Sequence, residues 1–83
     1  MAEITPVELE AMRARCVAAT PGPWQSFVEG RDHTGGSSCI RTGGEVDIEL
    51  SGATISDQDF IANARQDLPR LIAEVKRLRE WKP

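Results

Sequence analysis

The sequence predicts an α+β fold in which an N-terminal helix and a C-terminal helical segment pack on a small three-stranded antiparallel sheet. Three observations predict it: a capped helical pattern near the N-terminus, alternating apolar and polar residues in the middle, and a second capped helical pattern after residue 54. The 83 residues suffice for one domain, which we expect to span residues 1–83. Because so short a chain buries only a modest core, we also expect it to form a homo-oligomer.

The first helix is predicted by its start and stop signals. Thr5 is placed to cap the helix, Pro6 fits the first helical position, and Glu8 completes a capping box with Thr5. An apolar stripe at helical spacing follows, formed by Leu9, Met12, Cys16 and Ala19. Arg15 lies largely off this stripe. The Thr-Pro-Gly-Pro run at residues 20–23 ends the helix, because proline disfavours helical geometry in the residue before it.

Three strands are predicted next, at residues 24–29, 38–42 and 45–50. The third is the clearest, because strict alternation turns Val46, Ile48 and Leu50 toward the core. The same alternation turns three carboxylates outward, those of Glu45, Asp47 and Glu49. Short glycine-rich connections between the strands indicate an antiparallel meander with one covered face.

A second helix is predicted after the strands. Ser56 and Asp59 repeat the capping signature, and Phe60, Ile61, Ala64 and Leu68 follow as its apolar face. Pro69 either kinks this helix or separates two helices, and we favour a break or a tight bend there. Beyond it, apolar residues at near-heptad spacing run on to Trp81. We expect this seam to pack on the sheet, with a dimer seam as the alternative.

The predicted core combines the apolar residues of the helices and strands. Its expected members are Leu9, Met12, Trp24, Ile48, Leu50, Phe60, Ile61, Leu68, Ile72 and Val75. We expect Cys16 and Cys39 to be free thiols that pack as small apolar residues.

Composition excludes several classes of function. The net charge of −3 argues against a duplex nucleic-acid binder, which needs a basic face to neutralise phosphates. With no secretory signal and no apolar run near about 20 residues, we expect a cytoplasmic protein without membrane contact. One histidine and two distant cysteines lack metal-ligand spacing, and a Gly-x-Ser-x-Gly turn is missing, so we expect neither a metal or cofactor nor catalytic residues.

The strongest candidate binding site is the loop between the first two predicted strands. It combines cationic, hydroxyl and glycine amide donors, and successive glycine amides can form a nest that binds an anion. The candidate ligand-binding residues are Arg31, His33, Thr34, Gly35, Ser37 and Ser38. Arg65 is a candidate for a second-side contact, and Trp24 either adds an aromatic face or anchors the core. The glycines are not followed by the lysine and helix of a nucleotide-hydrolysing P-loop.

Four segments carry a resemblance to a known group of proteins. They are TPGPW at 20–24, EGRDH at 29–33, DIELSGAT at 47–54 and DQDFIANARQDLP at 57–69. With these motifs the chain resembles a group of small bacterial and phage- or prophage-borne proteins, and more distantly the Ead-like accessory proteins of phages. The resemblance implies an accessory role in a mobile-element context, in which small proteins often inhibit a host system or sequester its signals.

Two functional hypotheses follow from these observations. The first is a non-enzymatic, oligomeric binding protein that sequesters or senses an anionic, nucleotide-type small ligand. The alternative is a stoichiometric protein inhibitor, such as an immunity or anti-defence factor, that meets a basic protein target with the acidic row at residues 45–49.

Overall fold

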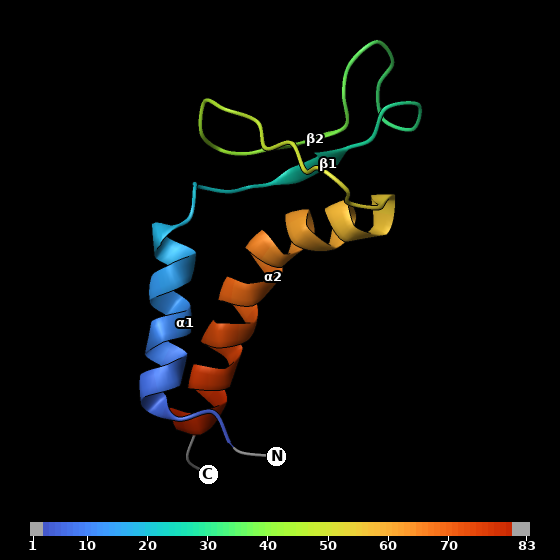
Figure 1. Cartoon of the computed structure of the whole chain (residues 1–83). Coiled ribbons are helices and arrows are strands. Elements are labelled where there is room, and N and C mark those ends of the chain that lie inside the picture. The colour runs from blue at the N-terminus through green and yellow to red at the C-terminus, as the bar shows by residue number, and fades with distance from the viewer. Residues whose placement is uncertain (1–2, 81–83) are drawn as a thin grey trace.

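The computed structural model describes residues 3–80 and has two helices joined by a strand hairpin. The elements follow in the order α1 (Pro6–Ala18), β1 (Gln25–Phe27), β2 (Cys39–Arg41) and α2 (Ile55–Glu80). The second half of α2 runs back alongside α1, and the strand hairpin lies across the first half of α2 (Figure 1). The predicted Trp81 extension of the apolar seam lies outside the described residues.

The predicted start of α1 is confirmed. The Thr5 hydroxyl accepts a hydrogen bond of 3.1 Å from the backbone N–H of Glu8, which satisfies one of the donors left free in the first turn. Pro6 occupies the first turn, where its missing N–H costs nothing. The helix ends at Ala18, just before the proline-rich segment, so local sequence signals set both ends of α1.

The prediction of three strands is wrong, because the sheet formed by the described residues has two. β1 and β2 pair antiparallel with Ser26 opposite Ile40. The segment at 45–50 approaches β2 through a single pair of hydrogen bonds, between Ile40 and Ile48 at 2.8 and 2.9 Å. Opposite Val46, where the next backbone pair of the ladder would fall, the Thr42 hydroxyl donates to the Val46 carbonyl and accepts from the Gly44 N–H in the turn. Alternation of residue type therefore continues where the hydrogen-bond ladder does not.

α2 differs from its prediction in two ways. Its capping box is formed by Thr54 and Asp57, each side chain accepting from the other's backbone N–H, and not by the predicted Ser56 and Asp59. The predicted break at Pro69 is also wrong, because α2 continues through this proline to Glu80. The helix curves along its length (Figure 1), which is how a helix accommodates an internal proline.

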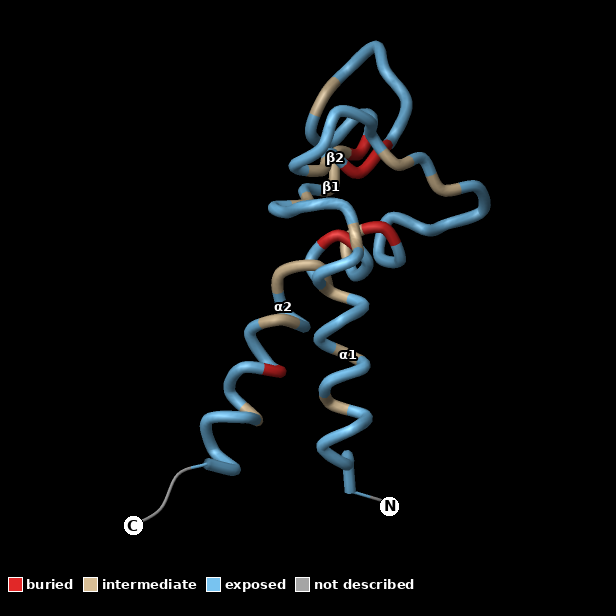
Figure 2. The backbone as a smooth tube through the Cα atoms, turned by 90° about the vertical axis from the view of Figure 1, so that its left-hand side faces the viewer, coloured by how far each residue is buried: buried red, intermediate tan, exposed pale blue. Residues whose placement is uncertain are grey.

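The buried core is small and lies mainly where the hairpin meets the first half of α2 (Figure 2). The buried apolar side chains of the described chain are Val28, Cys39, Ile40, Ala62 and Ile72. Of the predicted core residues only Ile72 is among them, and Phe60, Ile61 and Leu68 are exposed by 74, 37 and 50%. The remaining predicted residues, Leu9, Met12, Trp24, Ile48, Leu50 and Val75, are half-buried. A hairpin of two strands is too narrow to cover the whole apolar face of a 26-residue helix.

Two glutamines of α2 join the hairpin to the helix through hydrogen bonds. The Gln58 amide, 5% exposed, donates to the Ser26 hydroxyl and to the carbonyls of Phe27 and Cys39. Two turns further on, Gln66 accepts from the backbone N–H of Trp24 at 2.7 Å and donates to its carbonyl at 3.0 Å. These amides bind backbone groups of both strands and of the residue before β1, and so satisfy them with hydrogen bonds.

Candidate functional site

The glycine-rich loop, residues 30–38, is held by two carboxylates, one in the loop itself and one on α2. The Arg31 guanidinium forms a bidentate pair with Asp59 of α2, at 2.8 and 3.0 Å, and its Nε donates to Asp32. The Asp32 carboxylate also accepts from the backbone N–H of Val28 at 2.8 Å. These contacts tie the loop to its own base and to the first turns of α2.

The charges of these groups are stabilised by their mutual contacts. Hydrogen bonds from Arg31 lower the pKa of Asp59 to about 2, and the same guanidinium, with the Val28 amide, lowers the pKa of Asp32. Hydrogen bonds to Asp59 and Asp32 in turn raise the pKa of Arg31. The cation expected to receive an anionic ligand is therefore already neutralised by two carboxylates of the chain.

The other predicted loop residues are arranged around the same cluster. The Gly35 N–H donates to the Glu29 carboxylate at 3.3 Å, and the Ser38 hydroxyl accepts from the Glu29 N–H. The His33 ring packs edge-on against Phe27 with ring centres 6.1 Å apart. The two remaining candidates, Thr34 and Ser37, are exposed. Of the predicted donors, Arg31 and the Gly35 N–H therefore bind carboxylates of the chain, whereas the buried His33 Nε2 has no hydrogen-bond partner among the described residues.

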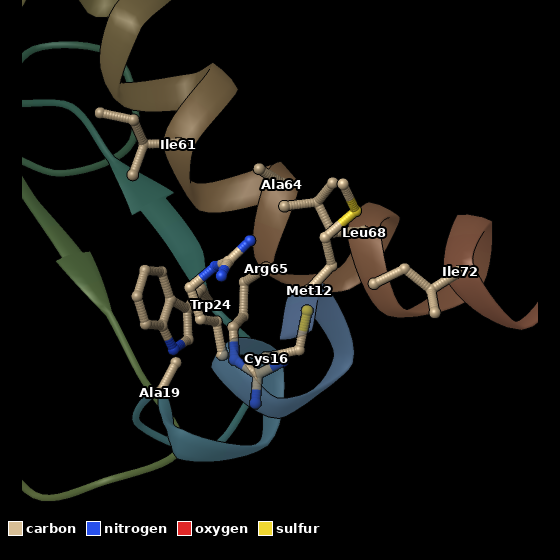
Figure 3. A pocket seen from close by; sticks show the side chains of 10 residues that line it. Met12, Cys16, Ala19, Trp24, Ile61, Ala64, Arg65, Leu68 and Ile72 are labelled. Carbon is tan, nitrogen blue, oxygen red and sulfur yellow. The ribbon is translucent and has the colours of Figure 1, made fainter. Parts of the chain in front are cut away.

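A cavity of about 280 Å³ lies elsewhere, where α1 and α2 diverge beneath the hairpin (Figure 3). Side chains from α1, from the segment before β1 and from the middle of α2 form its walls, and most of them are apolar. The lining residues are Met12, Arg15, Cys16, Ala19, Trp24, Ile61, Ala64, Arg65, Leu68 and Ile72. We call this cavity the interhelical pocket.

The segment carrying Trp24, which lines this pocket, is fixed in place by hydrogen bonds. Trp24 Nε1 and Arg65 Nε both donate to the Thr20 carbonyl, each at 3.0 Å. On the other side, the Gly43 N–H donates to the Pro21 carbonyl at 2.7 Å. Because Gln66 also forms two hydrogen bonds with the Trp24 backbone, the indole and the Arg65 guanidinium are positioned before any ligand binds.

Two arginines give the pocket its charge. Neither Arg15 nor Arg65 forms an ion pair with a carboxylate of residues 3–80, whereas Arg13, Arg31 and Arg77 each do. Two unneutralised guanidinium groups beside an apolar wall attract an anion whose remaining surface is apolar. The interhelical pocket therefore has the chemistry of a site for a small amphipathic anion.

The structure separates the residues that the sequence analysis grouped together. Arg65, predicted as a second-side contact of the loop, lines the interhelical pocket with Trp24. Arg31 remains in the loop, where it pairs with Asp32 and with Asp59 of α2. Arg15 was missed because it was placed off the apolar stripe. Its spacing of three residues from Met12 and four from Ala19 was the signal that could have found it.

Comparisons of the chain with protein-family models, with curated proteins and with solved structures give no match. The resemblance to small phage-borne proteins therefore remains an expectation that the motifs carry. Among residues 3–80, no helix combines the length and the apolar character needed to cross a membrane.

Proposed function

We propose that this chain is a non-enzymatic binding protein whose interhelical pocket takes an anionic small ligand with a flat apolar part, such as a nucleotide. One observation carries the proposal: two guanidinium groups without carboxylate partners in the described chain lie at a preformed apolar pocket that contains an indole. Ligand sites of proteins commonly combine apolar walls with a few fixed polar groups in this way.

The proposed ligand is matched to the pocket by size and by chemistry. A volume of about 280 Å³ lies just below the usual range for ligand sites, about 300–1,000 Å³, which favours a mononucleotide over a larger molecule. An aromatic base would pack against Trp24 and the apolar side chains of the walls, and its phosphate would meet Arg15 and Arg65. Arg65 uses its Nε for the Thr20 carbonyl, which leaves its terminal nitrogens to donate to the phosphate.

The role that fits such a site is sequestration or sensing. The resemblance to phage-borne accessory proteins supports a setting in which a host signal is captured, and this part of the proposal depends on the resemblance. A binding role needs only a positioned pocket, and the hydrogen bonds of Gln66 and Arg65 provide the positioning.

Calorimetric titration with adenosine monophosphate, adenosine and inorganic phosphate tests the proposal. We expect the monophosphate to bind more tightly than either fragment. Arg15→Gln should weaken its binding about tenfold, a loss of about 1.4 kcal/mol, while leaving adenosine binding unchanged. Arg13→Gln is the matched control, because Arg13 lies on the same helix and is neutralised by Glu10 at 2.7 Å. No heat with any of the three probes, or equal losses in both variants, would overturn the proposal.

The second candidate function, a stoichiometric protein inhibitor, is supported by the acidic surface at residues 45–49. Glu45, Asp47 and Glu49 are exposed, and none of them pairs with a cation of the described chain. A row of free carboxylates can steer the chain toward a basic protein surface. Pull-down from host lysate with the wild type and with a variant carrying lysine at all three positions tests this candidate. It predicts that the variant no longer captures the protein retained by the wild type, and equal capture would count against it.

A further inference from the structure

The chain exposes more surface than a folded monomer of its mass. Its accessible surface is 6449 Å², whereas a compact monomer of 9.1 kDa exposes about 4,900 Å². Its radius of gyration of 15.9 Å likewise exceeds the roughly 12 Å of a compact domain of this length. The excess is about 1,500 Å² for the whole chain, and the two helices are exposed over most of their length (Figure 2).

Part of this surface is an apolar seam along α2. The seam consists of positions spaced alternately by three and four residues, which are Ile61, Ala64, Leu68, Leu71, Val75 and Leu78. Leu68, Leu71 and Leu78 are exposed by 50, 59 and 57%. A run of two and a half heptads on one helix face arises because α2 is continuous through the proline.

α1 leaves part of the seam uncovered, because it packs mainly on the neighbouring side of α2. Ile72, on that side, is 8% exposed. Pro69 faces the same way and, with Cys16 and Ile72, lines a gap between the two helices. Two exposed seam residues, Leu71 and Leu78, take no part in lining the interhelical pocket. The apolar face of α2 is therefore wider than one neighbouring helix can bury.

We infer that a second copy of this chain covers the seam, so that the protein is a homodimer joined through α2. A specific interface of ordinary size buries about 800 Å² on each partner, and the excess surface of the chain is large enough to supply this area. The heptad spacing favours a helix as the partner, because such a seam packs knobs into the holes of a similar seam. A twofold pair supplies that similar seam from the same residues in each copy.

The inference goes beyond ligand binding and can fail independently of it. Ile61, Ala64 and Leu68 belong to both the seam and the wall of the interhelical pocket, so a second copy would lie next to the pocket's open side. Leu71 and Leu78 belong to the seam alone. Substitutions at these two residues therefore address dimerisation without removing a side chain from the pocket.

Sedimentation equilibrium of the full chain over a concentration series tests the inference. The wild type is expected at twice the 9.1 kDa chain mass, and the double variant Leu71→Glu, Leu78→Glu at the single mass. We expect this variant to raise the dimer dissociation constant at least about a hundredfold, because each seam would bury two unpaired carboxylates. Arg70→Glu is the matched control, since it makes the same change of −2 in net charge at an exposed position beside the seam, and it should remain dimeric.

A second measurement needs no variant and applies even if the glutamates unfold the chain. In a mixture of labelled and unlabelled wild-type copies, we expect intermolecular NOEs to the methyl groups of Leu71 and Leu78. A wild type that sediments as a monomer throughout, or a dimer whose intermolecular NOEs lie away from α2, would overturn the inference. Dimerisation retained in the folded double variant would overturn it as well.

Discussion

Replacing Gln58 with alanine is expected to destabilise the fold by about 2–4 kcal/mol. The side chain is 5% exposed, and its two amide N–H groups serve three acceptors: the Ser26 hydroxyl at 2.8 Å, the Phe27 carbonyl at 3.2 Å and the Cys39 carbonyl at 3.1 Å. These acceptors lie on both strands, so this one amide joins the whole hairpin to α2.

The expected loss of stability in Gln58→Ala follows from the hydrogen-bonding groups that lose their partner. Two lost hydrogen bonds contribute about 2 kcal/mol, and carbonyls left unsatisfied beside a cavity add up to about 2 kcal/mol more. A domain of this length is stable by roughly 4–12 kcal/mol, so the loss is a large share of the total. The corresponding fall in Tm is on the order of 10–30 °C.

Urea and thermal unfolding followed by far-UV circular dichroism measure this loss. Gln25→Ala is the matched control, because Gln25 is an exposed glutamine on β1 and its loss should be within about 0.5 kcal/mol. A loss below about 1 kcal/mol for Gln58→Ala, or equal losses at the two positions, would refute the assignment of Gln58 as the fastening of the hairpin.

Three further predictions concern single residues. Gly43→Ala should cost about 1–3 kcal/mol in urea unfolding, because a Cβ there would lie 2.3 Å from the Gly22 carbonyl oxygen; an unchanged midpoint would contradict this close approach. Since the pKa of Asp59 falls from 3.8 to about 2, the stability that its pair with Arg31 contributes is complete above pH 3.8 and lost as the pH falls toward 2. Asp59→Asn should remove that part of the pH dependence of urea unfolding, and an unaltered acid profile would argue against the pair. Pro69→Ala should raise the Tm, because an internal proline costs a helix up to about 3 kcal/mol, and a lowered Tm would indicate that packing depends on the curvature of α2.

The sequence predicted the parts of the fold that depend on neighbouring residues. Thr5, Pro6 and Glu8 lie within four positions, and the cap by the Thr5 hydroxyl and the first-turn proline form as expected. The Glu8 carboxylate accepts from the Thr5 hydroxyl and not from its backbone N–H, so the predicted box is formed only in part. The first two strands and the general α+β character followed from equally local patterns. The third strand failed because alternation gives the preference of a segment for extended structure, while a strand also needs a continuous backbone ladder. Beside the turn at 43–44 the Thr42 hydroxyl, and not a backbone N–H, donates to the Val46 carbonyl.

The contacts that position the candidate site are distant in the chain, which explains why sequence analysis missed them. Gln66 reaches Trp24 over 42 positions, and Arg31 reaches Asp59 over 28. A glutamine that binds a backbone, or an arginine that binds one of several carboxylates, has no characteristic pattern. Arg31 therefore looked free for a ligand, although it is the most fully paired cation of the loop.

A titration of the isotopically labelled chain with adenosine monophosphate, followed by NMR, shows whether the ligand binds at the interhelical pocket. We expect the largest chemical-shift changes at the Trp24 indole N–H and the Arg65 Nε–H, which lie at the interhelical pocket. Chemical-shift changes concentrated instead at the amides of Gly35 and Gly36, with the Trp24 signal unmoved, would place the ligand in the glycine-rich loop and contradict binding at the interhelical pocket.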